Sequence, residues 1–165
     1  MIKAVIVMND QGKPRLVKFF TFQAVEKQHE LIRSIYGVLC SRANNVSNFI
    51  KVDSLFGPDA RLVYKIFATL YFVFVFDTSE NELAVLDLMQ VFVETLDKCF
   101  HNVRELDIVF NFNKVHAILD EIILGGQVVG TNSPEVVKAV IEISKMDKPA
   151  NSIMLVPSIS GWSSR

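Results

Sequence analysis

The chain of 165 residues has few of the side chains on which disulfide-bonded and metal-binding proteins depend. It has two cysteines, Cys40 and Cys99, and three histidines. Both cysteines lie in apolar, helix-like stretches, so we expect buried free thiols in a reducing compartment rather than a disulfide. No C-x-x-C or H-x-x-x-H spacing is present, and Cys99 and His101 would point in different directions on a helix. The sequence therefore predicts no metal site.

An excess of one charge and long apolar runs are also missing. Lys and Arg number 17 and Asp and Glu number 18, which gives a net charge of −1 with the two signs interspersed. Without a basic stripe to displace counterions, we expect no nucleic acid as partner. No run approaches the roughly 18 consecutive apolar residues of a membrane-spanning helix. Half of the residues are nonetheless hydrophobic, which excludes a disordered chain and favours an obligate protein interface.

Motifs of the common enzyme classes are absent as well. The chain has no G-x-S-x-G, no P-loop and no G-x-G-x-x-G. Asp87, Glu94 and Asp97 share one face of an expected helix with Gln90, a pattern typical of a solvated stripe rather than of a catalytic pair. We therefore predict no enzymatic activity and no cofactor, and favour a binding or assembly role.

The most informative stretch of the chain runs from residue 67 to residue 100. Leu70–Phe76 is an unbroken apolar run rich in aromatic and β-branched residues, which predicts a strand buried on both faces. Ser79-Glu80-Asn81-Glu82 has the form of a capping box and predicts a helix over 80–100. Apolar residues cover more of this helix than of an ordinary surface helix. We therefore expect it to be central in the fold or shared with a partner.

The remaining patterns predict mostly strands first and helices later. The other expected strands are Ile2–Met8, Arg15–Phe20, Phe49–Val52 and Arg61–Phe67. The other expected helices are Ala24–Cys40, a short turn within 101–108, Asn111–Leu124 closed by Gly125-Gly126, and 133–144. Five strands with one helical interruption predict an α+β fold, with an antiparallel meander and helices on its faces. Residues 1–145 would form one domain, and 146–165, which lack any periodicity, a flexible C-terminal tail.

Several motifs, in the same order along the chain, resemble the small (sigma) subunits of clathrin-adaptor complexes. They are GKPRL at 12–16, YKIFATLYF at 64–72, FVETLD at 92–97 and FHNVRELDIV at 100–109. The resemblance covers roughly residues 1–145, and the segments 53–59 and 90–100 look most like the branch that serves adaptor protein complex 3. That family has the longin-like fold, a five-stranded antiparallel sheet flanked by α-helices, so the resemblance implies this fold here.

The resemblance also implies a role and partners. The chain would be a core subunit of a heterotetrameric coat adaptor, with a delta-type large adaptin as obligate partner, a second large chain and a medium chain. Such a complex selects transmembrane cargo at Golgi or endosomal membranes for lysosomes or vacuoles. The chain would then be cytoplasmic and peripheral on these membranes and on coated vesicles. In related complexes, the small chain and a neighbouring large chain bind acidic dileucine signals in cargo tails.

A candidate dileucine-binding site follows from the same resemblance. The matching positions are Arg15, Ala68, Leu70, Val93, Asn102, Val103 and Ile108. The apolar members would receive the two leucine side chains, and Arg15 would face the acidic residue upstream. Four of these positions also have a structural interpretation: Leu70 and Val93 as core, Arg15 as a solvated strand residue, and Asn102 as a helix C-cap.

Three positions depart from the family pattern and keep other functions open. Ile66 and Phe67 stand where a basic residue and a tyrosine are usual, and Arg104 stands where cysteine is usual. A purely structural adaptor subunit with an inactive pocket is one alternative. A longin-type regulatory domain of the SNARE or tethering kind is another. It would be supported by a C-terminal SNARE heptad or lipidation signal, which residues 161–165 do not provide.

Overall fold

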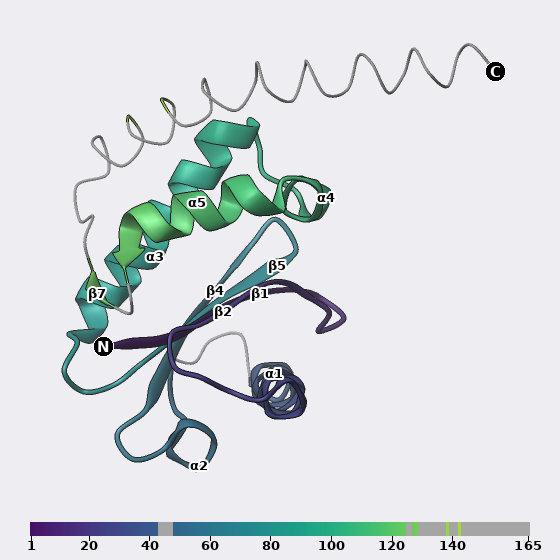
Figure 1. Ribbon diagram of the computed structural model, residues 1–165. Helices are drawn as coiled ribbons and strands as arrows, with labels where there is room; N and C mark the ends of the chain where they lie inside the picture. The colour runs from purple at the N-terminus through teal and green to yellow at the C-terminus, as the bar shows by residue number, and fades with distance from the viewer. Residues whose placement is uncertain (43–47, 125–126, 129–137, 139–141, 143–165) are drawn as a thin grey trace, which may run out of the picture.

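A five-stranded antiparallel sheet lies between helices in the computed structural model, which describes residues 1–42, 48–124, 127–128, 138 and 142. Figure 1 shows α1 on one face of the sheet and α3 and α5 on the other. The strands of the sheet are β1 (Ile2–Asn9), β2 (Pro14–Phe19), β3 (Phe49–Lys51), β4 (Arg61–Phe67) and β5 (Leu70–Phe76). The helices are α1 (Val25–Cys40), α2 (Asp53–Phe56), α3 (Glu82–Phe100), α4 (Glu105–Phe110) and α5 (Phe112–Ile122). The predicted α+β, longin-like architecture is confirmed.

The strands lie in the order β2-β1-β5-β4-β3, and every neighbouring pair is antiparallel. The prediction of a simple meander is therefore wrong, because β5 pairs with β1 after the β3-β4-β5 meander. The physical reason is that the most buried strands take inner positions in the sheet. β1 and β5 are almost entirely buried along their lengths, and only the inner positions of the sheet cover a strand on both sides.

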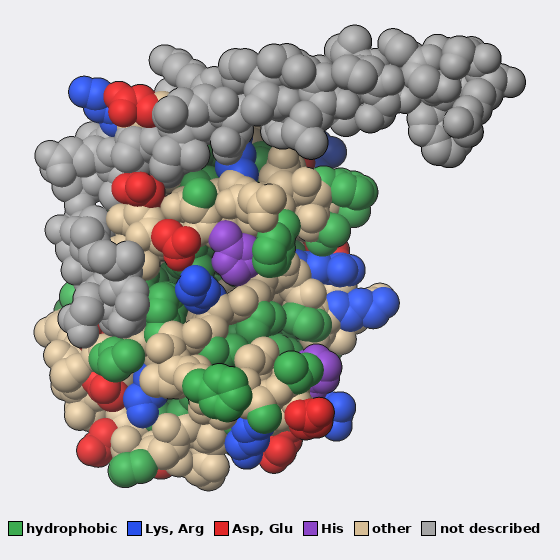
Figure 2. All heavy atoms as spheres, in the orientation of Figure 1, with side chains coloured by type: hydrophobic (Ala, Val, Ile, Leu, Met, Phe, Trp, Pro, Cys, Tyr) green, Lys and Arg blue, Asp and Glu red, His purple; other side chains and the backbone are tan. Residues whose placement is uncertain are grey.

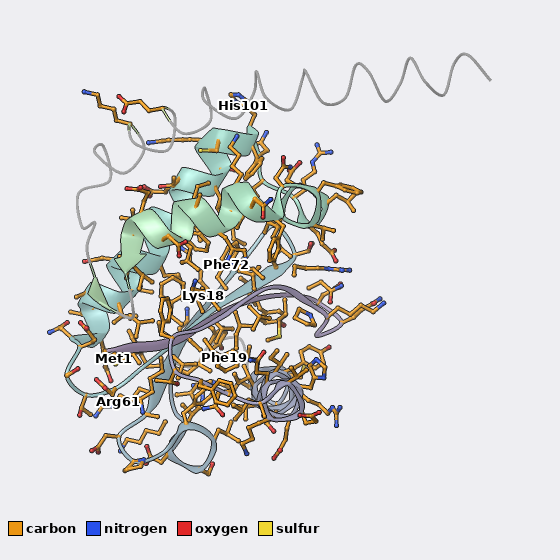
Figure 3. All side chains as sticks on the ribbon, viewed as in Figure 1. Met1, Lys18, Phe19, Arg61, Phe72 and His101 are labelled. Atoms are coloured by element: carbon orange, nitrogen blue, oxygen red, sulfur yellow. The ribbon has the colours of Figure 1, made fainter. Side chains whose placement is uncertain are left out.

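Side chains of β5 alternate between two apolar clusters, one on each face of the sheet. Phe72, Phe74 and Phe76 pack with the buried residues of α3 and α5. Val73 and Val75 pack with the buried residues of α1. Figure 3 labels Phe72 on the side of the sheet that faces α3 and α5, and Phe19 on the side that faces α1. The prediction that this strand is buried on both faces is confirmed.

The long helix begins two residues later than the sequence predicted. Its N-cap is Asn81, whose side-chain oxygen accepts hydrogen bonds from the backbone N–H groups of Leu83 at 2.9 Å and Ala84 at 3.2 Å. The predicted capping box at Ser79 is wrong. The Ser79 hydroxyl instead contacts the Asp77 carboxylate and the amino group of Met1, so it is not available to the helix.

The C-terminal part of the described chain also differs from expectation. α5 ends at Ile122, and β6 (Ile123–Leu124) pairs antiparallel with β7 (Gln127–Val128). The predicted helix 111–124 was therefore two residues too long at its C-terminus and one at its N-terminus, where Asn111 is the N-cap. Gly125-Gly126, the tail 146–165 and most of the helix expected over 133–144 lie outside the described residues. The short helix α2 was not predicted, and Val52, expected in a strand, is its N-cap.

The two cysteines are free, and they differ in exposure. Cys99 is half-buried, and burial raises the pKa of its thiol. Cys40, the last residue of α1, is exposed. The expectation of two buried thiols is therefore wrong for Cys40. The buried stripe of α1 consists of Leu31, Ile32, Ile35 and Leu39, and Cys40 lies off it.

Candidate functional site

The residues predicted to bind a dileucine signal lie around the turn between β4 and β5 and around α4. Figure 1 shows this turn pointing toward α4, with the tip of the β1–β2 hairpin on the same side of the molecule. Arg15 is on β2, Ala68 is in the β4–β5 turn and Leu70 begins β5. Val93 is on α3, Asn102 and Val103 connect α3 to α4, and Ile108 is on α4.

Four of the five apolar members, all except Ala68, are packed in one core cluster. The exposed fractions are 0% for Leu70, 2% for Val93, 1% for Val103 and 0% for Ile108. The structural interpretation of Leu70 and Val93 as core residues therefore holds for this state of the chain, and Val103 and Ile108 are core residues as well. Room for two leucine side chains at these positions requires the four side chains to move apart.

The turn between β4 and β5 has an unusual backbone. Ala68 and Thr69 both have positive φ, 49° and 68°, as a two-residue type I′ hairpin requires. Neither is Gly, Asn or Asp, the residues that adopt this conformation most easily. The turn fixes the register in which Phe67 faces Leu70, and it leaves Ala68 exposed at the tip.

The connection from α3 to α4 is also shaped by left-handed residues. His101 is the C-cap of α3 with φ 51°, and Asn102 follows with φ 75°. Asn102 is thus one residue past the C-cap that the structural interpretation assigned to it. The Asp97 carboxylate accepts the backbone N–H of Val103 at 3.1 Å, which directs the chain back toward the core. Figure 3 labels His101 at this end of α3.

Arg15 is paired with a residue that the sequence did not point to. Its Nε donates to Oε1 of Glu105, the first residue of α4, at 2.6 Å, and both side chains are 29% exposed. The same oxygen accepts a hydrogen bond from Nδ2 of Asn9 at 3.0 Å. The hydrogen bonds from Asn9 and Arg15 lower the pKa of the Glu105 carboxyl. Arg15 is therefore not simply a solvated strand residue.

The three departures from the family pattern leave the apolar cluster intact. Ile66 is 55% exposed, whereas Phe67 packs against the core cluster. Arg104 is exposed and is the N-cap of α4. Its backbone N–H donates to the Asp107 carboxylate at 2.8 Å, one half of a capping box. Arg104 therefore lies outside the packed cluster and does not crowd it.

An exposed apolar surface lies beside the same site. We call it the α4 corner; its members, with exposed fractions, are Leu106 (63%), Val109 (39%), Phe110 (78%) and Phe112 (53%). Figure 2 shows hydrophobic side chains gathered over α4, with Lys and Arg side chains next to them over the β1–β2 hairpin. Singly exposed apolar residues are common, but a contiguous group of this kind marks an interaction surface.

Among the described residues, no group of His, Cys, Asp and Glu is arranged to hold a metal ion, and no helix is long and apolar enough to cross a membrane. The polar stripe of α3 takes part in ordinary surface contacts. Gln90 donates to Glu94 at 3.0 Å and accepts from Lys65.

Comparison with known proteins places the fold and these motifs in one family. Residues 1–147 match the family model described as the clathrin adaptor complex small chain. The chain belongs to this family. The resemblance seen in the motifs is thereby confirmed, and with it the expectation of a coat-adaptor small chain.

Curated relatives and a related structure share almost the whole chain. It is 69% identical over 166 residues to the AP-3 complex subunit sigma of Arabidopsis thaliana, covering 100% of both chains. It is 45% identical over 159 residues to the AP-3 complex subunit sigma-2 of Homo sapiens, covering 96% of this chain and 82% of that one. A chain of the structure described as a homology model of the full-length AP-3 complex in a stretched open conformation matches with TM-score 0.72 and 39% identity. That match covers 92% of this chain and 98% of that chain.

Proposed function

We propose that this chain is the small subunit of an AP-3-type adaptor complex and serves vesicle-mediated protein transport without catalysing a reaction. The observation that carries the proposal is 69% identity to the Arabidopsis AP-3 sigma subunit, over the full length of both chains. The match in fold to a chain of the AP-3 complex supports it. In this role, residues 1–145 form the domain that enters the complex, and 146–165 form a tail.

The chain works in a heterotetramer with a delta-type large subunit as obligate partner, a second large subunit and a medium subunit. The exposed α4 corner supports a large partner surface, because three of its four side chains are more than half exposed. The complex brings the chain to the cytoplasmic side of Golgi, endosomal and coated-vesicle membranes, and it sorts cargo to lysosomes or vacuoles.

Within the complex, the chain binds acidic dileucine signals through Arg15, Ala68, Leu70, Val93, Asn102, Val103 and Ile108. Burial of two leucine side chains among the apolar members contributes about 3–5 kcal/mol before the costs of ordering the peptide. Arg15, whose side chain is 29% exposed, adds about 0–1 kcal/mol through the acidic residue and raises the rate of encounter. The sum suits a reversible, roughly micromolar interaction.

The exposed tip of the β4–β5 turn offers the sharpest test of where the signal binds. Substitution of Val93 by Asp would bury a carboxylate at a position that is 2% exposed, so it would compromise the fold. Ala68 is exposed and has φ 49°, which both Asp and Asn adopt readily. Ala68→Asp adds a charge that repels an acidic peptide, and Ala68→Asn is its neutral control.

The measurement is fluorescence anisotropy of a labelled peptide with a Glu upstream of Leu-Leu, against this chain co-purified with its large partner. We expect micromolar binding by wild type and Ala68→Asn, and binding weakened about three- to tenfold by Ala68→Asp at low salt. Equal binding by the two variants would place the acidic part of the signal elsewhere.

A structural subunit without a working pocket is the second candidate. It is favoured by the burial of Leu70, Val93, Val103 and Ile108, each 2% exposed or less. Absence of peptide binding by an intact wild-type complex would support it. A longin-type SNARE or tethering regulator is the third, and it would be monomeric and soluble without a large partner.

A further inference from the structure

Glu105 holds the arginine that the proposed function assigns to the acidic residue of cargo. Its Oε1 accepts Arg15 Nε–H at 2.6 Å and Asn9 Nδ2–H at 3.0 Å. Asn9 is itself fixed, since it is 5% exposed and its Oδ1 accepts the backbone N–H groups of Gln11 and Lys13, each at 2.9 Å. The β1–β2 hairpin therefore presents a preformed pair of donors, and the carboxylate of α4 occupies it.

The carboxylate is charged at neutral pH and cancels much of the attraction that Arg15 offers. The hydrogen bonds from Asn9 and Arg15, and the nearby charge of Lys13, all lower the pKa of the Glu105 carboxyl. Arg15 and Glu105 are both 29% exposed, so water screens the pair only in part. An incoming acidic residue therefore meets an arginine whose charge is already compensated.

The edge of the Arg15 guanidinium that Glu105 occupies determines which edge remains for an incoming carboxylate. A carboxylate binds arginine most strongly through two parallel N–H groups of one edge. Glu105 takes Nε, and so closes the side edge of Arg15 to a second carboxylate. We propose that Glu105 is an internal competitor of cargo: it occupies Arg15 in the empty site, and the acidic residue of a dileucine signal binds by displacing it. The proposal rests on the proposed function above.

Displacement of Glu105 would also affect the apolar part of the site. α4 carries Glu105 at its first position and Ile108, 0% exposed, three residues later. The contacts of Glu105 with Asn9 and Arg15 tie this helix to the β1–β2 hairpin. Their loss removes a tie on the helix that carries Ile108, which belongs to the same core cluster as Leu70. The acid and the leucines of one signal thus act on the same short helix.

The test compares two labelled peptides that carry Glu or Gln upstream of the same Leu-Leu pair, by anisotropy against the chain co-purified with its large partner. Glu105→Gln keeps an oxygen that accepts the same two hydrogen bonds and removes the charge. We expect about fivefold tighter binding of the Glu peptide, a gain that shrinks as salt rises, and no change for the Gln peptide. Glu30→Gln is the matched control, because it removes an exposed carboxylate from α1 on the other face of the sheet.

Each outcome decides the proposal once size-exclusion chromatography shows intact complexes. Unchanged or weaker binding of the Glu peptide by Glu105→Gln, with wild type binding, overturns the competition and leaves the proposed function standing. If the Glu105→Gln complex binds the Glu peptide and the wild-type complex does not, the competition is supported in its strongest form. If neither complex binds either peptide, both the competition and cargo recognition are overturned.

Discussion

The ring of Phe72 on β5 meets the ring of Phe92 on α3 edge to face, with centroids 6.1 Å apart and planes at 79°. Phe74 lies 6.1 Å from the same ring at 51°. Phe92 is 0% exposed, so it joins the central strand to the long helix in a fully buried contact. Aromatic pairs of this geometry each contribute about 0.5–1.5 kcal/mol beyond the burial of their area.

Phe92→Ala is therefore expected to lower the free energy of unfolding by about 3–5 kcal/mol, through lost burial and a residual cavity. Phe92→Leu should cost less, because it keeps most of the volume. Leu83→Ala, on the same helix but 66% exposed, is the control and should change stability little. Urea unfolding followed by circular dichroism measures all three. Equal losses for Phe92→Ala and Leu83→Ala would contradict the central role of this ring.

The start of α3 gives a second prediction. Asn81→Ala should lower the free energy of unfolding by about 1 kcal/mol, because the N–H groups of Leu83 and Ala84 lose their acceptor. Asn81→Asp keeps an acceptor at the same position and should retain the stability. Thermal unfolding of the two variants separates these outcomes. If Asn81→Ala melts with wild type, the cap does not stabilise α3.

The contact between Met1 and Asp77 makes stability depend on pH. The Met1 amino group donates to Asp77 Oδ1 at 2.7 Å, and this bond, with that from Ser79, lowers the pKa of Asp77 from 3.8 to about 2. A lowered folded-state pKa stabilises the fold above the unfolded value and loses this effect as the carboxylate is protonated. The contribution of Asp77 should therefore be complete above about pH 4 and disappear toward pH 2.

Thermal unfolding of wild type and Asp77→Asn between neutral pH and pH 2 checks this prediction. Wild type should melt higher at neutral pH, and the two curves should converge as the pH falls toward 2. A difference in melting temperature that stays constant over this range would show that the charge of Asp77 is not the cause.

The turn between β4 and β5 offers a stabilising substitution. Ala68 and Thr69 have φ 49° and 68°, which side chains without special turn chemistry adopt at a cost. Ala68→Asn combined with Thr69→Gly supplies the favoured type I′ pair and should raise the free energy of unfolding by about 1 kcal/mol. Thr69→Val keeps a β-branched residue and should give no gain. Urea unfolding compares the two, and a destabilised Asn-Gly variant would contradict the prediction.

Sequence patterns predicted where the strands lie along the chain more accurately than how the strands are arranged in the sheet. β4 and β5 begin and end at the predicted residues, since local composition determines where a strand forms. The pairing of β1 with β5 involves residues far apart in the chain, and no local pattern reports it. The start of α3 was misplaced for a related reason, because Ser79 is held by Asp77 and Met1.

The candidate site was predicted only as far as family resemblance extends. The family resemblance identified Arg15 and the apolar residues as site residues. It did not identify Glu105, whose contact with Arg15 spans 90 positions of sequence. A glutamate at the start of a short helix is ordinary capping chemistry, and nothing in its neighbours indicates a partner on β2. Such a contact is found only once the topology has placed α4 against the hairpin.

The inner position of β1 has a consequence for the order of folding. β1 precedes the other four strands of the sheet in the chain, and β2, the next strand, pairs with one of its edges. Its other edge has no partner until Leu70–Phe76 has left the ribosome. During that interval an apolar strand edge is open to the wrong partner, a known hazard of long-range strand pairing.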